Sequence, residues 1–193
     1  MSLDDQIRWD RQYGQSDRSE KPSAFLKQIF DEGHWDIAPG RALDIASGAG
    51  RNALFLAEKG FHVTAIDISQ VGLDQGARRA AERSLSIAWQ QADLENCQLP
   101  PGPYELIVNI NYLQRSLIPH MKSALAPGGY IVFETYLIDQ QTIGHPKNPD
   151  YLLGHNELLS HFRDFRVLCY REGKFVDDAE PSYRAGILGQ KKH

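Results

Sequence analysis

The sequence has few cysteines, no long apolar run and no excess of basic residues, and each absence excludes a class of protein. Its two cysteines, Cys97 and Cys169, lie far apart, so neither a disulfide framework nor a metal site is predicted. No apolar stretch reaches the roughly 18 residues that a membrane helix needs, and residues 1–10 lack the apolar core of a signal peptide. We therefore expect a cytoplasmic protein with no membrane partner.

The net charge and the length of the chain restrict the class of protein further. Lys and Arg number 21 against 25 Asp and Glu, and the resulting net charge of −4 offers no general positive field for a phosphate backbone. Nucleic acid is therefore not an expected partner. A chain of 193 residues fits one α/β domain but not a cofactor domain with a separate substrate domain. The sequence does not define an oligomeric state.

The most informative segment is Ala42–Asn52, with the sequence ALDIASGAGRN. An apolar strand that carries Asp44 leads into a turn with Gly48 and Gly50, and a helix follows. Glycine allows the backbone to turn sharply and to approach a ligand, and the free N–H groups at the start of the helix face that ligand. This pattern predicts a nucleotide-cofactor site.

The acid at Asp44 bears on which cofactor binds. A carboxylate repels a pyrophosphate and attracts an ammonium group, which favours a cofactor with an amino-acid end, such as S-adenosylmethionine. The alternative is a dinucleotide fingerprint at Gly48-x-Gly50-x-x-Ala53. In both cases Asp67, about 20 residues further on, would hold the adenosine ribose. A tight turn that binds no ligand is the third interpretation.

Apolar periodicity and turn residues predict alternating strands and helices. The expected helices cover residues 24–30, 52–59, 69–83 and 117–125, and the expected strands cover residues 42–46, 61–66, 86–90, 104–109 and 130–135. Two further strands, 165–170 and 183–188, have no helix between them and predict an antiparallel hairpin. The fold class is therefore α/β: a seven-stranded Rossmann-like three-layer sandwich with a mostly parallel sheet and a C-terminal antiparallel hairpin. Ligands bind such sheets at the carboxyl ends of the strands, where Asp44, Asp67, Asp93 and Asn109 fall.

This order of elements, with polar residues closing the strands, resembles the class I S-adenosylmethionine-dependent methyltransferases over nearly the whole chain. The run Gly48-x-Gly50-Arg51-Asn52 resembles in particular their tellurite-resistance and thiopurine methyltransferase branch. The resemblance implies that Asp44 anchors the methionine end of the cofactor, that Asp67 accepts both ribose hydroxyls, and that Asp93 meets the adenine amine. Further cofactor contacts that it implies are Ala46, Ser47, Gly48, Gly50, Arg51, Asn52, Ile68, Ala92, Leu94 and Asn109.

Two places depart from the family patterns. Ala46 stands where the acid-x-Gly-x-Gly-x-Gly pattern has its first glycine, a mild change because alanine is the next smallest residue. The segment Asn109-Ile-Asn-Tyr112 keeps the ends of the Asn-Pro-Pro-Tyr motif of amine and amide methyltransferases but lacks both prolines. In the catalytic interpretation Asn109 or Asn111 accepts a hydrogen bond from the nucleophile and Tyr112 shapes the pocket. In the alternative, Tyr112 packs on the sheet.

The remaining segments suggest how the site is covered. Trp9 and Tyr13 resemble the N-terminal Trp-x-x-x-Tyr of small-molecule methyltransferases and predict a lid that brings Tyr13 to the active site; the alternative is a hydrophobic staple. The long irregular segment 137–154 is where a substrate-selecting loop is expected. We divide the single domain 1–193 into an N-terminal lid and helix (1–38), a cofactor-binding core (41–136), a substrate-side loop and helix (137–162) and a closing hairpin (163–193).

The predicted function is methyl transfer from S-adenosylmethionine to a small molecule, either a soft nucleophile (a thiol, or a selenium or tellurium oxyanion) or an amine. Direct displacement needs mainly alignment, so a soft anion requires no general base, whereas a protonated amine does. Two alternatives stay open. A nicotinamide-dependent single-domain reductase would need a proton donor such as Tyr-x-x-x-Lys, but Ser116 takes the lysine position after Tyr112. A non-catalytic methyltransferase-like adaptor is the other.

Overall fold

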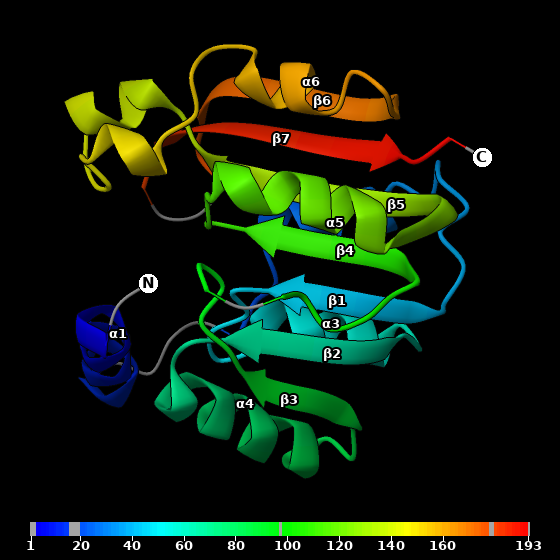
Figure 1. Cartoon of the computed structure of the whole chain (residues 1–193), viewed down its shortest axis with the longest axis vertical. Helices are drawn as coiled ribbons and strands as arrows, with labels where there is room; N and C mark the ends of the chain where they lie inside the picture. Colours follow the sequence, from blue (N-terminus) through cyan, green and yellow to red (C-terminus); the bar gives the residue numbers. More distant parts are fainter. Residues whose placement is uncertain (1–2, 16–19, 97, 178–179, 193) are drawn as a thin grey trace.

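The computed structural model describes residues 3–15, 20–96, 98–177 and 180–192. One seven-stranded sheet has the order β3-β2-β1-β4-β5-β7-β6 (Figure 1). The first five strands along the chain are parallel, and β7 runs antiparallel to both β5 and β6. The predicted fold class is confirmed. The strands are β1 (Arg41–Ile45), β2 (His62–Asp67), β3 (Ile87–Gln91), β4 (Tyr104–Ile110), β5 (Leu125–Tyr136), β6 (Arg166–Phe175) and β7 (Ser182–Gln190).

Helices cover both faces of the sheet. On one face, α2 (Ala24–Asp31) and α3 (Arg51–Glu58) bury Phe25, Leu26 and Leu56 against β1, β4 and β5. Nearby, α4 (Gln70–Glu82) packs on β2 and β3. On the other face lie α5 (Ile118–Ala124) and α6 (Glu157–His161). The apolar spacing predicted from the sequence therefore corresponds to the faces that the sheet buries.

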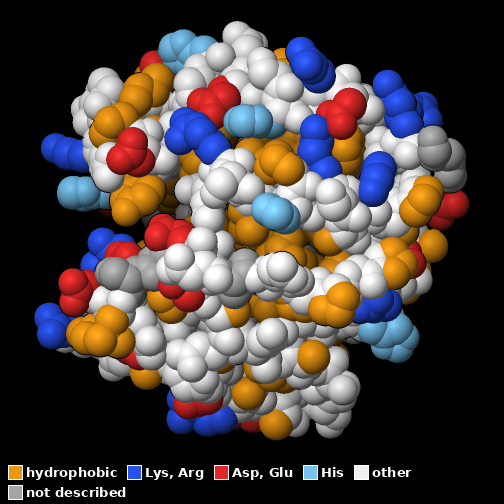
Figure 2. All heavy atoms as spheres, viewed as in Figure 1, with side chains coloured by type: hydrophobic (Ala, Val, Ile, Leu, Met, Phe, Trp, Pro, Cys, Tyr) orange, Lys and Arg blue, Asp and Glu red, His pale blue; other side chains and the backbone are white. Residues whose placement is uncertain are grey.

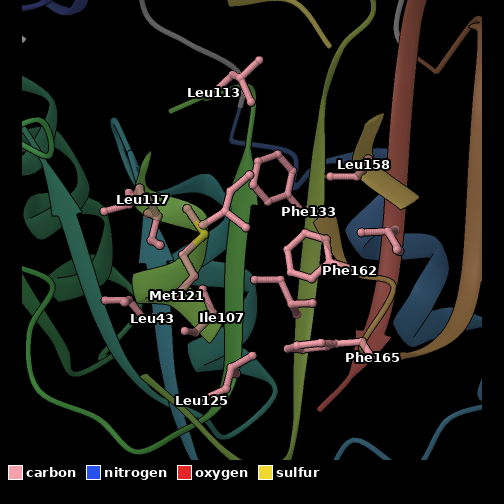
Figure 3. Close-up of a cluster of buried hydrophobic side chains, with 14 of the residues drawn as sticks. Leu43, Ile107, Leu113, Leu117, Met121, Leu125, Phe133, Leu158, Phe162 and Phe165 are labelled. Carbon is pink, nitrogen blue, oxygen red and sulfur yellow. The ribbon is translucent and has the colours of Figure 1, made fainter. Parts of the chain in front are cut away.

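The larger core cluster lies under α5 and α6 (Figure 3). Met121 of α5 and Phe133 of β5 are fully buried. The ring of Phe162 lies 6.1 Å from that of Phe133 and 5.3 Å from that of Phe165, centroid to centroid. This aromatic row joins the closing hairpin to the parallel part of the sheet.

The carboxyl ends of the parallel strands form one edge of the molecule, on the left of Figure 1. The order reverses at β1, which lies between β2 and β4, and such a reversal opens a crevice for ligands. Two segments flank this edge: α1 (Leu3–Gln15), and residues 137–154 with the short 3-10 helices η2 (Ile138–Thr142) and η3 (Pro149–Tyr151). The fold thus covers the edge where the sequence placed the candidate site.

Several local predictions differ from the structure. The helix expected at 117–125 begins with a 3-10 turn, Arg115–Leu117, and ends at Ala124. The strand expected at 130–135 is longer: β5 begins at Leu125, and its pairing with β4 shifts register between Tyr104 and Leu106. Residues 3–15 form a helix, although no periodic apolar pattern predicted one there. Cys97 lies outside the described residues, and Cys169 is a free, partly buried thiol. None of the helices in the described ranges has the length and apolar character of a membrane span.

Candidate active site

The turn between β1 and α3 has an unusual backbone. Ala46, Gly48 and Gly50 have φ angles of 52°, 57° and 76°, in the left-handed region. The Ser47 N–H donates to the Ile66 carbonyl at 3.0 Å, and the Gly50 N–H donates to the Ser47 carbonyl at 2.9 Å. A residue with a Cβ pays about 1–2 kcal/mol for this conformation. Ala46 is therefore a strained substitution rather than a mild one.

Both glycines of this turn are required by close neighbours. A Cβ on Gly48 would lie 1.9 Å from the Tyr13 hydroxyl oxygen, and one on Gly50 would lie 2.3 Å from Cη2 of Trp89. A Cβ on Gly72, at the start of α4, would lie 3.1 Å from Cδ2 of Tyr13. The structure therefore brings Tyr13 of α1 against the predicted cofactor turn, where it is 9% exposed.

Asp44 is the most unusual group at this edge. It is 1% exposed, and neither carboxylate oxygen has a hydrogen-bond partner among the described residues. Burial raises the pKa of Asp44 to about 7, although the nearby Ala53 N–H, which does not complete a hydrogen bond, opposes the rise. The Ser47 hydroxyl is also buried, again with no partner in the part of the chain that the structure describes. Unsatisfied buried polar groups are costly, so these atoms are candidates to accept hydrogen bonds from a bound ligand.

Asp67 closes β2 and accepts two backbone hydrogen bonds. Its Oδ2 accepts from the Gly48 N–H and its Oδ1 from the Ser69 N–H, both at 2.8 Å. Burial raises its pKa, and these N–H groups oppose the rise. A carboxylate has about four acceptor positions, so two hydroxyls can still be accommodated. The adjacent Ile68 is buried, and its carbonyl accepts from the Gln91 side chain at 3.0 Å.

The segment after β3 carries the predicted adenine contacts. The Ala92 N–H donates to the Asp67 carbonyl at 2.9 Å, which ties this segment to β2. Asp93 accepts from the Glu95 N–H at 3.0 Å and from the Asn96 side chain at 2.7 Å. Leu94 is buried in the core. Contact between Asp93 and an adenine stays a prediction.

Arg51 and Asn52 begin α3. The carbonyl oxygen of the Asn52 side chain accepts from the Ser23 N–H at 2.9 Å, and Asn52 is 5% exposed. Asn52 thus holds the start of α2 on α3, a structural task that the sequence did not indicate. Arg51 lies close enough to Asp44 to lower its pKa, against the larger effect of burial.

The turn after β4 orients one amide. Asn109 is fully buried, and its Nδ2 donates to the Tyr112 carbonyl at 2.7 Å. Its Oδ1 is therefore fixed as an acceptor, and it has no partner in the described part of the chain. Asn111 has a φ of 62°, and the half-buried Tyr112 donates its hydroxyl to Gln114 at 2.5 Å. Asn109 therefore presents a free acceptor atom. The contacts of Tyr112 do not distinguish a role in shaping the pocket from packing on the sheet.

Helix α1 is attached to α4 by residues that sequence reasoning missed. Asp10 accepts from the Ser69 hydroxyl at 2.6 Å and from the Val71 N–H at 3.2 Å. The Gln75 side chain donates to the Tyr13 carbonyl at 2.7 Å. Asp10 lies three residues before Tyr13 and so faces the same side of the helix. That spacing from Tyr13 is the sequence pattern that could have indicated a role for Asp10.

Across the edge from α1, Arg115 ties the segment 137–154 to the turn after β4. Its guanidinium donates to both carboxylate oxygens of Glu157, at 2.6 and 3.0 Å, and to the carbonyls of Asp150 and Leu152. These bonds hold the pKa of Glu157 down, to about 2, against the opposing effect of burial. No sequence pattern linked residues 115 and 157.

The two segments that border the edge expose large apolar side chains. Leu3 and Ile7 of α1 are 71% and 49% exposed, and Ile143 and Tyr151 are 44% and 46% exposed. Figure 2 shows the surface hollowed on the left, between the part that carries residues 137–154 and the part that carries α1.

A buried ionic cluster lies beside the same edge. Glu134 of β5 is 2% exposed and pairs with Arg171 of β6 at 2.6 Å and with Arg184 of β7 at 3.7 Å. Burial raises the pKa of Glu134, and the two arginines oppose the rise. Two histidines near this edge make other contacts. The exposed ring of His155 pairs with Asp139 at 2.6 Å, and the backbone carbonyl of His145 accepts from the Gln140 side chain. Within the described ranges, no group of three or more side chains could hold a metal ion.

The α/β fold and the glycine turn at this edge are typical of proteins that bind a nucleotide cofactor. Comparisons with known proteins show which of these proteins the chain resembles. Residues 42–129 match the family described as a methyltransferase domain. The protein of Haemophilus influenzae with the name "Probable S-adenosyl-L-methionine-dependent methyltransferase TehB" is 26% identical over 143 residues, which cover 70% of this chain and 49% of that protein. A ubiquinone biosynthesis O-methyltransferase of Nitrosococcus oceani is 28% identical over 116 residues, 57% of this chain and 49% of its own length. The crystal structure of Haemophilus influenzae TehB superposes with a TM-score of 0.73 at 22% identity, covering 97% of this chain and 67% of that one.

These findings confirm the resemblance to the class I S-adenosylmethionine-dependent methyltransferases, and within them to the TehB branch. The matched region begins in β1 and includes the glycine turn, Asp67 and Asp93. The chain spans about half the length of the curated relatives it matches.

Proposed function

We propose that the protein is an S-adenosylmethionine-dependent methyltransferase that acts on a small molecule bearing a soft nucleophile or an amine. One observation carries the proposal: Asp44 is a buried carboxylate, directly beside a glycine turn, that has no hydrogen-bond partner in the described ranges of the chain. An ammonium group supplies the missing donors, whereas a pyrophosphate would be repelled. The methyltransferase domain match and the relatives named as methyltransferases support the same conclusion.

The residues at the edge fit such a cofactor. Asp44 and Ser47 would hold the methionine end, Asp67 the ribose hydroxyls and Asp93 the adenine. When bound, S-adenosylmethionine supplies a methyl group on a positively charged sulfur. The chain's own task is then to align the acceptor and to exclude water, which contributes several kcal/mol to lowering the barrier.

Two groups of this chain act toward the acceptor. The Oδ1 atom of Asn109 accepts a hydrogen bond from an N–H, O–H or S–H group of the acceptor and so orients its nucleophilic atom. Tyr13, held by α1 over the glycine turn, keeps water from the reacting groups. A soft anion needs no general base in this arrangement, while an amine must arrive deprotonated or find an acceptor for its proton.

Parallel calorimetric titration with S-adenosylmethionine, S-adenosylhomocysteine and NADH tests the proposal. We expect both sulfur compounds to bind and NADH not to bind. NADH binding alone would instead support a reductase. Methyl transfer to a panel of thiols, amines, selenite and tellurite follows, and no transfer to any of them despite tight cofactor binding would favour an adaptor. A cytoplasmic location and independence from nucleic acid remain predictions.

A further inference from the structure

A tryptophan of β3 shares a row of side chains with the proposed cofactor acid. Trp89 lies in register with Ala65 of β2, and Ala65 lies in register with Asp44 of β1. Residues paired in this way point to the same face of a sheet. The middle position, Ala65, is fully buried and carries only a methyl group, so a large ring can lie beside it. The half-buried Trp89 packs against the same core cluster as α3.

The outer edge of the indole ring lies between two glycines. A Cβ on Gly50, at the start of α3, would lie 2.3 Å from Cη2 of Trp89 and 2.7 Å from Cζ3. A Cβ on Gly76 of α4 would lie 2.4 and 2.6 Å from the same two atoms. Gly50 has a positive φ, but Gly76 has the ordinary backbone of a helix interior, where glycine is unfavourable. The space that Trp89 needs is therefore the structural reason for glycine at position 76.

Helix α4 lies along β3 (Figure 1) and also contacts α3. A Cβ on Gly76 would lie 3.1 Å from the Ala49 carbonyl oxygen of the glycine turn. A Cβ on Gly72, four residues earlier on the same face of the helix, would lie 3.2 Å from the Gly48 carbonyl carbon. The indole of Trp89 therefore occupies the corner between β3, α4 and the turn, and the turn rests on it.

We propose that Trp89 is a positioning residue that holds the turn between β1 and α3 in the shape that binds the cofactor. The inference deepens the proposed function and rests on it, because this turn is assigned to the methionine end of the cofactor. Trp89 acts through Gly50 and Gly76 and does not touch the cofactor. In a close-packed interior, a void or a surplus methyl group at this corner displaces its neighbours. Either change lowers the fraction of molecules whose turn can bind, and the apparent affinity falls by the same factor.

Two variants disturb this corner in opposite ways. Trp89→Phe removes the part of the ring that reaches the two glycines and leaves a void. Gly76→Ala adds a methyl group that the helix accepts but the indole does not. The double variant places the added methyl group in the void, so the two changes should compensate. Trp35→Phe is the matched control, because Trp35 is half-buried against the same core cluster but precedes β1, at the end of that strand away from the turn.

Calorimetric titration with S-adenosylhomocysteine measures the effect, and thermal unfolding verifies that each variant is folded. We expect the affinity to fall about 5- to 50-fold in each single variant and to return to within about 3-fold of the wild-type value in the double variant. Trp35→Phe should bind as tightly as the wild-type protein, even if its melting temperature falls. Hydrogen exchange in residues 46–53 should accelerate in both single variants and recover in the double variant.

Unchanged affinity in both folded single variants overturns the proposal, since a lower melting temperature alone would reduce Trp89 to core packing. Losses that multiply in the double variant, instead of cancelling, overturn it as well. Failure of the wild-type protein to bind S-adenosylhomocysteine refutes the proposed function instead. Hydrogen exchange in residues 46–53 of the free protein then still tests Trp89, and an unchanged rate in both single variants overturns its positioning role.

Discussion

The proposed cofactor side of the edge, the turn from β1 to α3 with the end of β2, and the proposed acceptor side, the turn after β4 with residues 137–157, differ in how their charged side chains are paired. On the proposed cofactor side, Asp44 and Ser47 keep buried oxygen atoms that have no partner among the residues the structure describes. On the acceptor side, Arg115 pairs with Glu157 and Arg171 pairs with Glu134 within the protein. An unsatisfied buried group costs about 1–3 kcal/mol. The proposed cofactor side therefore leaves a buried carboxylate for a ligand to pair with, whereas on the proposed acceptor side these charged groups are paired within the protein and only the neutral Oδ1 of Asn109, among the described residues, is left buried without a partner.

The largest effect is expected at Asp67. Asp67→Asn keeps the shape of the side chain but replaces an acceptor oxygen with a donor, which would face the ribose or one of the N–H groups of Gly48 and Ser69. We expect S-adenosylmethionine affinity to fall about 100- to 1,000-fold, the loss of two charge-assisted hydrogen bonds. Calorimetry measures it. Glu157→Gln on the acceptor side is the control and should bind the cofactor normally; equal losses in both variants would contradict the division into two sides.

The next effect concerns Asp44 and pH. The pKa of Asp44 is raised to about 7 in the folded protein. Protonation of Asp44 therefore stabilises the ligand-free protein fully below the ordinary pKa near 4, and this stabilisation is lost as pH rises to about 7. A bound ammonium favours the ionised carboxylate, so cofactor binding at pH 6 should release close to one proton. Binding at pH 8.5 should release almost none. Titrations in buffers of different ionisation enthalpy count these protons.

Asp44→Asn provides the reference for this pH dependence. The amide cannot ionise, so proton release at pH 6 should fall to the remainder contributed by other groups, Asp67 among them. The ligand-free variant should also lose the decline in thermal stability between pH 5 and pH 7.5. Equal proton release by wild-type protein and variant would remove Asp44 from the cofactor site.

A smaller effect is expected at Arg115, on the acceptor side. Arg115→Met removes the bonds to Glu157 and to the carbonyls of Asp150 and Leu152. We expect unfolding free energy to fall by about 1–2 kcal/mol, since the pair is partly exposed. Hydrogen exchange should accelerate mainly in residues 137–157. Cofactor affinity should not change, and the exposed Arg163→Met should change neither quantity.

The Arg115 contribution should also depend on pH. Because the pKa of Glu157 is lowered to about 2, the stabilisation is present above its ordinary pKa of 4.5 and is lost as pH falls toward 2. The stability difference between wild-type protein and Arg115→Met should therefore shrink on acidification. A difference that stays constant from pH 6 to pH 2.5 would show that the carboxylate is not the partner that matters.

The same comparison explains what could be predicted from the sequence. The cofactor side is made from one turn and strand ends close in sequence: Gly48 and Asp67 are 19 residues apart. A short motif therefore predicts this candidate site, and the alternation of elements predicted the sheet. On the acceptor side, Arg115 meets Glu157 across 42 residues and Asn111 meets Arg184 across 73. Such pairs follow from strand order and the packing of loops, which no local pattern encodes.

The smallest effect is expected at Tyr13, where the two sides meet. Its ring is buried over Gly48 and Gly72, while its hydroxyl lies against the turn. Tyr13→Phe keeps the apolar packing of a staple and removes only the hydroxyl. If α1 is a lid, cofactor affinity should fall about 2- to 10-fold, as for one hydrogen bond, with little change in melting temperature. Calorimetry and thermal unfolding of one sample give both numbers. Unchanged affinity in Tyr13→Phe, with a lower melting temperature in Tyr13→Ala, would make α1 a staple.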